Sequence, residues 1–286
     1  MALVSVMMPV GVPVPDLDRA VASVLAQTHS DWELLLVADE SQPSVAKIIE
    51  QVDDSRIRLI ARPDACGRGA AREAGLQTAR GDYLAFLDAD DWMYPQRLAM
   101  QVGWLQQNPD LALVCGGMIV EDDRDQVAGV RRDPVEPGRV HVFEPGLDDP
   151  PLLNAASMLR LDQVGDAGYD PGLDRGEDSD FFYRFLAGRS FQYLPDIIYC
   201  YREYDSFSIS GLRDGLRGSR DRRLNRCRGG VQKLAVSGRY LVSRCANETL
   251  FALRGQVGVL QRRNRPASAD ELQAHDRARQ CLEPLP

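Results

Sequence analysis

The sequence predicts an α/β fold in which helices flank a mostly parallel sheet, with a helical region at the C-terminal end. Three observations lead to this prediction. In the first half of the chain, short apolar runs alternate with stretches whose apolar residues recur at helical spacing. The connections between these elements are short, as in sheets with helices on both faces. Beyond Ser210 the chain becomes rich in arginine and then carries apolar positions at helical spacing.

The first elements follow one another in a regular order. Val4–Val10 is a nearly continuous apolar run, as expected for a strand covered on both faces. A helix follows, with Asp16 as a candidate N-cap and with five apolar residues on one face, Leu17, Ala20, Val21, Val24 and Leu25. Further strands are predicted at Leu34–Val37, Ile57–Ala61 and Tyr83–Leu87, and the helices between them at Ser44–Val52 and Gly69–Ala79.

The pattern becomes less regular in the second half. A helix is predicted at Pro95–Gln107 and a strand at Leu111–Val120, whereas residues 121–150 are rich in charge, Pro and Gly and are expected to loop out. We therefore expect a main domain at 1–210, with halves at about 1–120 and 121–210, and a helical extension at 211–286. In the extension, Leu234–Leu260 fits one or two amphipathic helices, and the last twenty or so residues are polar enough to fray.

Composition excludes several classes of function. The 286 residues are 44% hydrophobic, which is enough for one good-sized core with an appendage. A formal net charge of −8 argues against general nucleic-acid binding. The six cysteines are scattered, with no CxxC pair and no neighbouring His, so we expect reduced thiols in a cytosolic protein and no zinc site.

Neither a signal peptide nor a membrane span is predicted. The stretch MALVSVMMPV lacks a basic beginning and soon reaches Pro and Asp, and no run of about 18 apolar residues exists. We expect a cytoplasmic protein. The arginine-rich stretch Arg213–Arg228 leaves two interpretations open. It contacts the inner face of an anionic membrane or a lipid-diphosphate acceptor, or it is a solvated helix whose arginines pair with nearby acids.

Carboxylates follow two of the predicted strands. Asp39 comes just after the second strand, and YLAFLDADDWMY places Asp88, Asp90 and Asp91 after the fourth. Ligands bind outside the carboxyl ends of parallel strands, so these acids are expected to face one crevice. A D-x-D sequence there suits Mg²⁺ or Mn²⁺, which would clamp a diphosphate. The alternative is that Asp90 or Asp91 caps a helix that begins near Trp92.

A second acidic group occurs in LDRGEDSD, residues 173–180, just before the amphipathic FFYRFLAG. Glu177 and Asp178 stand at the start of a predicted helix. They are either helix-capping acids in a favourable position on the helix dipole, or they include a general base that takes a proton from an attacking hydroxyl.

Five segments, in order and at suitable spacing, resemble the inverting glycosyltransferases of family 2, which have the GT-A fold. They are VSVMMPV, SVLAQTHSDWELLLVADES, CGRGAAREAGLQTARGDYLAFLDADD, GEDSDFFYR and YREYDSFSIS, and together they span about residues 3–208. The resemblance implies a Rossmann-like GT-A domain. Its first half would bind a nucleotide-diphosphate sugar and its second half an acceptor.

The resemblance also implies roles for particular residues. Asp178 would be the base that activates an acceptor hydroxyl, with Glu177 helping to bind the acceptor. Asp90 would bind Mn²⁺ or Mg²⁺ directly, with Asp88 close to the ribose or the metal. The residues implied for nucleotide-sugar binding are Pro9, Val10, Asp39, Arg72, Asp88, Ala89 and Asp90. Those considered for a glycan, lipid-linked or other hydroxyl acceptor are Trp92, Tyr201 and Arg202, and for Trp92 simple packing is the alternative.

The departures from the family pattern concern the donor more than the chemistry. Gly11 and Val12 stand where the family has Tyr-Asn, so the nucleobase need not be uracil, and Ala38-Asp39-Glu40-Ser41 replaces D-D-G-S. The absence of a Q-x-x-R-W motif favours transfer of one sugar per encounter, in polysaccharide or glycoconjugate biosynthesis.

Two other functions stay open. A non-catalytic homologue that binds a nucleotide or glycan is expected to have lost an acid of the D-x-D or E-D motif, and both motifs are intact. A nucleotidyltransferase needs a basic, Gly-rich loop near the first strand, and GVPVPD has no Lys or Arg.

Overall fold

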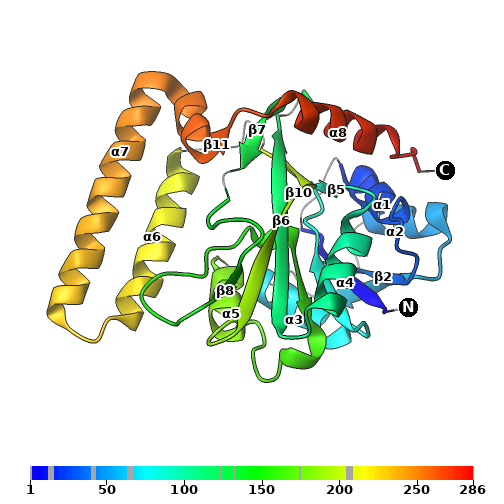
Figure 1. The fold of residues 1–286 in the computed structure, drawn as a ribbon, viewed down its shortest axis with the longest axis horizontal. Coiled ribbons are helices and arrows are strands. Elements are labelled where there is room, and N and C mark those ends of the chain that lie inside the picture. The colour runs from blue at the N-terminus through cyan, green and yellow to red at the C-terminus, as the bar shows by residue number, and fades with distance from the viewer. Residues whose placement is uncertain are drawn as a thin grey trace.

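The computed structural model describes residues 2–11, 16–39, 43–62, 67–122, 124–131, 133–173, 175–203 and 209–285. Within them the predicted α/β fold is confirmed, because a central sheet lies between helices (Figure 1). The predicted elements of the first half are present as β1 (Val4–Pro9), α1 (Leu17–Leu25), β2 (Trp32–Asp39), α2 (Pro43–Val52), β3 (Ile57–Arg62), α3 (Arg68–Thr78) and β4 (Tyr83–Phe86).

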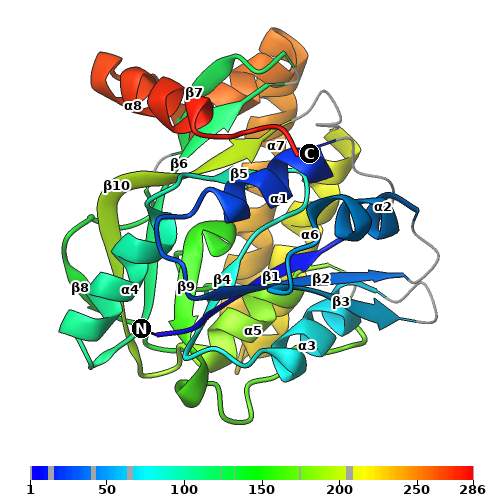
Figure 2. The same cartoon turned by 90° about the vertical axis from the view of Figure 1, so that its right-hand side faces the viewer.

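These strands form the parallel part of the sheet. β1 pairs in parallel with β2 on one side and β4 on the other, and β2 pairs in parallel with β3. Figure 2 shows α1 and α2 on one side of these strands, and α3 and α5 (Glu177–Phe185) on the other. Because parallel strands end at one edge, the residues that follow β1, β2 and β4 lie next to one another.

The second half makes the sheet mixed. It contains β5 (Trp92–Met93), α4 (Arg97–Gln107), β6 (Leu111–Glu121), β7 (Val127–Arg131), β8 (Val140–Val142), β9 (Ser157–Arg160) and β10 (Ser190–Arg202), with short 3₁₀ turns at Asn154–Ala156 and Leu161–Gln163. β9 pairs antiparallel with β4 and β6, whereas β10 runs parallel to β6. The prediction that residues 121–150 simply loop out is wrong, since β7 and β8 lie there.

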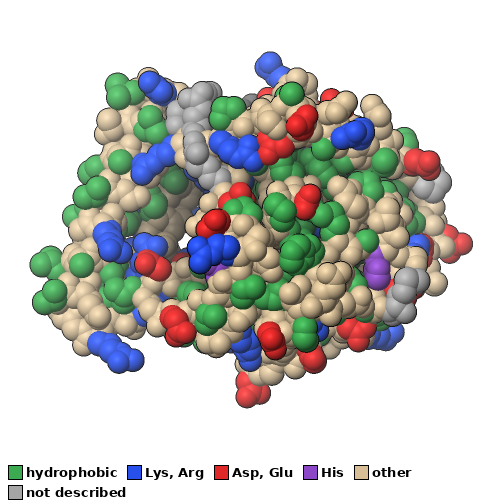
Figure 3. Space-filling model, in the orientation of Figure 1, with side chains coloured by type: hydrophobic (Ala, Val, Ile, Leu, Met, Phe, Trp, Pro, Cys, Tyr) green, Lys and Arg blue, Asp and Glu red, His purple; other side chains and the backbone are tan. Residues whose placement is uncertain are grey.

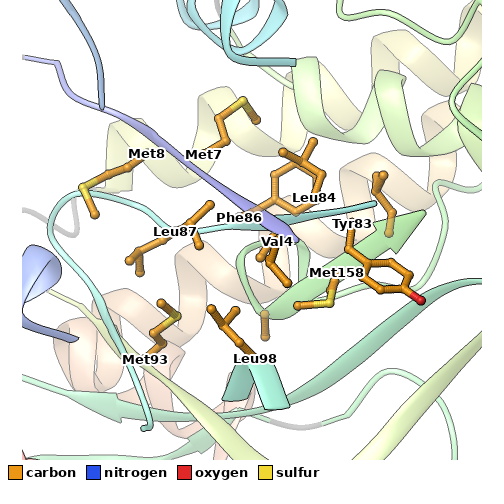
Figure 4. Packing of buried hydrophobic residues seen from close by; sticks show 14 of the residues in the cluster. Val4, Met7, Met8, Tyr83, Leu84, Phe86, Leu87, Met93, Leu98 and Met158 are labelled. Atoms are coloured by element: carbon orange, nitrogen blue, oxygen red, sulfur yellow. The ribbon is translucent and has the colours of Figure 1, made fainter. Parts of the chain in front are cut away.

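The core lies between the sheet and the helices. Its residues come from most of the helices and strands of the domain, and those of β1, β4, β9 and α4 include Met7, Phe86, Met158 and Leu98 (Figure 4). β1 is buried on both faces over Val4–Met8, as the continuous apolar run predicts. This packing fixes the strand ends from which the polar site residues project.

The C-terminal region begins with a helical hairpin beside the domain. α6 (Ile209–Arg226) lies between the domain and α7 (Gly230–Arg263), and α7 is interrupted at Gly255, where φ is 60° (Figure 1). No helix in the described ranges is long and apolar enough to cross a membrane.

The chain then returns to the domain through β11 (Asn264–Arg265), which pairs antiparallel with β7, and α8 (Ala269–Gln280). Ser268 and Glu271 form a capping box at the start of α8. His275 and Ala278 on this helix are buried against the domain. The expectation of a frayed end is therefore wrong for α8.

Candidate functional site

The turn after β4 gives its three acids different environments. Asp91 is 1% exposed, and its carboxylate accepts hydrogen bonds from the Tyr199 hydroxyl at 2.7 Å and the Arg202 backbone N–H at 2.8 Å. The Tyr199 hydroxyl in turn accepts one from the Asp88 backbone N–H at 3.2 Å. Burial, together with the charges of Asp88 and Asp90, raises the pKa of Asp91 well above its ordinary value. Asp91 is therefore a structural acid that fixes the turn.

The helix-cap interpretation of Asp90 and Asp91 is wrong. The turn is followed by β5, and α4 begins only at Arg97. The carboxylates of Asp88 and Asp90 therefore do not serve as helix caps.

One arginine joins the two predicted acidic groups. Arg72 lies on α3 and is 9% exposed. Its Nη1 donates to Glu177 Oε1 at 2.8 Å, its Nη2 lies 3.3 Å from Asp88 Oδ1, and its Nε lies 2.9 Å from Asp178 Oδ1. Three carboxylates from two segments far apart in the sequence therefore share one guanidinium, a group whose planar fork suits such pairing.

The start of α5 sets the properties of Asp178. Gly176 precedes the helix with φ of 77°, a conformation that favours glycine, and Glu177 and Asp178 lie in the first turn. The Tyr169 hydroxyl donates to Asp178 Oδ1 at 3.3 Å, and the Tyr169 ring stacks on Phe181. Burial raises the pKa of Asp178 to about 6, with Glu177 and Asp88 adding to the rise and Arg72 opposing it. A carboxylate with this pKa is suited to accept a proton near neutral pH.

Asp88 and Asp90 fit a hard divalent cation. Asp88 is 38% exposed and Asp90 is partly buried. Burial and the charge of Asp88 raise the pKa of Asp90. Among the described residues, no hydrogen bond or ion pair from another side chain reaches the Asp90 carboxylate. Two adjacent carboxylates that repel each other are the oxygen ligands that Mg²⁺ or Mn²⁺ stabilises.

A small open pocket of about 40 Å³ brings these groups together at the carboxyl edge of the sheet. The pocket is lined by Met7, Pro9, Arg72, Phe86, Leu87, Asp88, Asn154, Ala155 and Asp178. The structure thus places Pro9, Arg72, Asp88 and Asp178, all predicted from the sequence, around one opening.

The remaining residues predicted for the nucleotide sugar lie near this edge. Val10 is buried and its N–H donates to the Val37 carbonyl at 2.8 Å. Ala89 is buried inside the turn. Asp39 ends β2 opposite Arg62, and its side chain lies outside the described part of the structure, as does Val12.

The prediction that Trp92 forms the floor of a sugar site is wrong. Its side chain is 0% exposed, it stacks on Tyr94, and its Nε1 donates to Glu121 Oε2 at 3.3 Å. His275 of α8 covers it, with ring centroids 5.2 Å apart. Trp92 therefore packs under the C-terminal helix, which is the alternative that its sequence context left open.

The other two residues predicted for the acceptor are partly or fully committed to internal contacts. Arg202 is 6% exposed and forms ion pairs with Asp16 at 2.8 Å and Asp125 at 3.0 Å. Tyr201 is partly buried, with the Arg131 guanidinium 5.2 Å from its ring centroid. A role for either residue in binding an acceptor stays a prediction.

A second cluster, formed by Glu121, Cys200 and His275, lies beneath α8. Its candidate ligand atoms are all within 4.8 Å of one another. His275 Nε2 is 2.9 Å from Glu121 Oε1, and His275 Nδ1 is 2.9 Å from the Tyr94 hydroxyl. Burial raises the pKa of Glu121, but the bonds from His275 and Trp92 outweigh it and hold that pKa below its ordinary value. The nitrogen and sulfur atoms make this set unlike a Mg²⁺ or Mn²⁺ site, and its hydrogen bonds hold α8 to the domain.

The arginine-rich stretch Arg213–Arg228 lies mostly on α6, where its side chains pair with acids. Arg222 and Arg226 share Asp149 at 2.9 and 2.8 Å, and Arg213 pairs with Glu248 at 2.7 Å. The other pairs are Arg217 with Asp214, Arg220 with Asp221 and Arg223 with Asp148. The structure therefore favours the interpretation of a helix paired with nearby acids.

Sequence reasoning missed three groups at or near the pocket. Tyr169 lies in an irregular segment, Asn154 begins a short 3₁₀ turn, and Tyr199 is one of several aromatic residues in a strand. No local signal distinguishes these side chains, and the partners of Tyr199, Asp88 and Asp91, are more than 100 residues away.

Comparisons with known proteins concern the family and the fold of this chain. A family model described as "Glycosyl transferase family 2" matches residues 5–158, which is more than half of the chain. The UDP-Glc:alpha-D-GlcNAc-diphosphoundecaprenol beta-1,3-glucosyltransferase WfgD of Escherichia coli is 36% identical over 106 residues, which cover 37% of this chain and 42% of that protein. The O-antigen biosynthesis protein RfbC of Myxococcus xanthus is 31% identical over 208 residues, which cover 68% of this chain and 15% of that protein. This chain thus spans less than half the length of either relative.

A solved structure with a similar fold is S. aureus TarS 1–349 in complex with UDP-GlcNAc. It aligns with a TM-score of 0.60 over 99% of this chain and 82% of its own length, at 15% sequence identity. At this identity the likeness concerns the fold alone.

Proposed function

The chain belongs to glycosyl transferase family 2, and on that basis we propose that it moves one sugar from a nucleotide-diphosphate sugar to an acceptor hydroxyl, with inversion at the anomeric carbon. The observation that carries the proposal is the Arg72 junction. It joins Asp88, from the turn after β4, to Glu177 and Asp178 of α5 at one pocket. A donor site and a base are both needed for such a transfer, and the residues that we propose for the two adjoin at Arg72.

The donor would lie in the first half of the domain, along Pro9, Val10, Asp39, Arg72 and the Asp88–Asp90 turn. The E. coli relative is named for UDP-Glc, and the S. aureus neighbour was crystallised with UDP-GlcNAc. UDP-sugars are therefore the first donors to test, although Gly11 and Val12 distinguish this chain from the usual family pattern.

We propose that Asp90, with Asp88, holds Mn²⁺ or Mg²⁺. When bound, such an ion stabilises the negative charge of a departing diphosphate. The chain itself supplies the two carboxylates at the end of a rigid strand, and Tyr199 and Asp91 fix the backbone of their turn. This support keeps the two oxygens in place.

Asp178 would take the proton from the acceptor hydroxyl as that oxygen attacks the anomeric carbon on the face opposite the diphosphate. A pKa of about 6 leaves most of this carboxylate ionised at pH 7 and still basic enough to accept a proton. Arg72 favours the ionised form, and the Tyr169 hydroxyl holds one carboxylate oxygen in place. Glu177 lies beside it and would contact the acceptor.

The acceptor is proposed to be a lipid-linked or glycan hydroxyl in the biosynthesis of polysaccharide or another glycoconjugate. The E. coli relative is named for an acceptor on diphosphoundecaprenol and the M. xanthus relative for O-antigen biosynthesis. A lipid-linked acceptor would require a peripheral contact with the membrane that holds it, and the protein is proposed to act on the cytoplasmic side. No observation in the structure favours the nucleotidyltransferase or the non-catalytic alternative.

The proposal is tested by hydrolysis of UDP-, GDP- and dTDP-linked sugars with Mn²⁺. Wild-type protein is expected to release one nucleoside diphosphate slowly, and Asp178→Asn is expected to lower this rate by about 10²- to 10⁴-fold, the usual contribution of a general base. Asp180→Asn is the matched control, because Asp180 lies in the same helical turn but pairs with Arg184 at the surface. Equal rates for wild type and Asp178→Asn would contradict the assignment of the base.

A further inference from the structure

The helical hairpin has two unlike faces. Between α6 and α7, the side chains of Val236 and Tyr240 are buried, the Arg220 guanidinium lies over the Tyr240 ring, and Glu248 pairs with Arg213. The opposite face of α7 points away from the domain (Figure 1). On that face the large apolar side chains are exposed.

The exposed apolar residues of α7 form one stripe. Val231 is 85% exposed, Leu234 75%, Leu241 55%, Val242 71% and Leu253 77%. Their spacing, together with that of the exposed small residues Ala235, Gly238, Cys245, Ala246 and Ala252, places them on a single side of a helix. Five of the nine exposed large hydrophobic side chains in the described structure lie here, so their position is not an even scatter over the surface.

The charge of α7 indicates which kind of surface covers the apolar stripe. α7 contains six Lys and Arg against a single Glu and no Asp, so it carries a net charge of +5 in a chain whose net charge is −8. The exposed cations Arg228, Lys233, Arg239 and Arg254 have no acidic partner among the described residues. In Figure 3, Lys and Arg side chains accompany the hydrophobic ones along the edge where α7 lies. By helical spacing Arg239 lies beside the stripe, and an exposed apolar stripe on a cationic helix is typical of a helix that lies in the interface of an anionic bilayer.

We propose that the outer face of α7, Val231–Leu253, docks this protein on an anionic lipid surface, with the helix parallel to the membrane. The stripe would be about 33 Å long at 1.5 Å per residue. A second copy of this chain is the less favourable occupant, because two such faces would bring like charges together. The surface differs from the arginine-rich stretch predicted from the sequence, since the arginines of α6 are paired with acids.

The position of the hairpin connects the proposed membrane-docking face to the helix that carries Glu177 and Asp178. Arg175, just before α5, lies 3.7 Å from Asp214 of α6, and Arg222 of α6 packs beside Gly176. The helix that carries Glu177 and Asp178 therefore adjoins α6, on whose far side α7 presents the stripe. Docking through α7 would bring Asp178 towards a lipid-linked acceptor, and this consequence rests on the proposed function.

The test measures binding of the full chain to vesicles by co-sedimentation, without any sugar transfer. Wild-type protein is expected to bind phosphatidylglycerol-containing vesicles and to bind pure phosphatidylcholine vesicles much less. Leu234→Glu with Val242→Glu is expected to weaken binding on the order of tenfold or more. The matched control is Val140→Glu with Val142→Glu on β8, where the side chains are 55% and 52% exposed. Far-UV circular dichroism checks that α7 stays helical.

Three results would overturn the proposal. They are failure of wild-type protein to bind anionic vesicles, equal loss of binding in both double variants, and a dimer in solution that the α7 variant alone disperses. The last result would assign the stripe to a second copy of the chain. Donor hydrolysis by the same samples tests the proposed function separately, because it requires neither vesicles nor an acceptor.

Discussion

Asp178→Asn is expected to stabilise the unliganded protein at neutral pH while it removes activity. The folded protein raises the pKa of this carboxyl from 3.8 to about 6. In the folded state the group therefore binds its proton more tightly than in the unfolded chain, so its ionisation opposes folding. The stability of the wild type should fall as the pH rises through the window from about 4 to 6.

The size of this effect follows from the pKa difference. At about 1.4 kcal/mol for each pKa unit, a rise from 3.8 to about 6 amounts to about 3 kcal/mol at neutral pH. The Asp178 side chain is 23% exposed, so solvent screens only part of the effect. Asparagine has no charge to desolvate, but it also loses the ion pair with Arg72. We therefore expect a net gain of about 1–3 kcal/mol at pH 7.5 and almost none at pH 4.

The assay is urea-induced unfolding of wild type and Asp178→Asn at several pH values between 4 and 8. The difference in the free energy of unfolding should grow as the pH rises. Asp180→Asn provides the control, since its ion pair with Arg184 is exposed and contributes at most about 1 kcal/mol. If Asp178→Asn were less stable than wild type at pH 7.5 and equal to it at pH 4, Arg72 would dominate the site and the reasoning would be wrong.

Three other predictions concern single side chains. Asp90→Ala should abolish any Mn²⁺-dependent rise in melting temperature produced by UDP in a thermal-shift assay, and an undiminished rise would move the metal elsewhere. Tyr169→Phe removes a hydrogen bond that lowers the pKa of Asp178, so the acidic limb of the pH–rate profile should move to higher pH by up to about one unit; an unmoved limb would exclude this role. His275→Ala should lower the free energy of unfolding in urea by about 2–4 kcal/mol, because buried Glu121 and Tyr94 lose a hydrogen-bond partner. A loss below about 0.5 kcal/mol would mean that other contacts hold α8 to the domain.

The fold of the first half could be predicted because each local pattern agrees with the tertiary structure. Val4–Met8 is apolar at nearly every position and is buried on both sides, so a single interpretation fits the pattern. α8 shows the opposite case. Only His275 and Ala278 of this helix are buried, so its sequence has no apolar periodicity that would predict packing against the domain. The apolar residues of β7 and β8 were likewise too few among charged neighbours to indicate strands.

The site could be predicted in its parts more readily than as a whole. The D-x-D and E-D motifs identify Asp88, Asp90 and Asp178 by their positions at element ends. Neither motif indicates that Asp91 is the structural acid, because its partners Tyr199 and Arg202 are more than 100 residues away. The prediction for Trp92 is wrong for a related reason. A tryptophan beside acids has the same local sequence whether it faces a ligand or packs under a distant helix.

The charges at the pocket connect the donor to the cation. Asp88, Glu177 and Asp178 share the guanidinium of Arg72, and Asp90 lies beside Asp88 within reach of the charge of Arg68, so among the described residues the acids outnumber the cations and the site is negative overall when the acids are ionised. A nucleotide-diphosphate sugar is itself an anion and would be repelled by this arrangement. A divalent cation on Asp88 and Asp90 would offset two of the charges and attract the diphosphate. Binding of the donor and of the cation should therefore be coupled, each raising the affinity for the other by the same factor. When the ion is absent, the same repulsion between the acids and the phosphates would weaken the binding of free nucleotides. The clustered acids would therefore make donor binding depend on the metal.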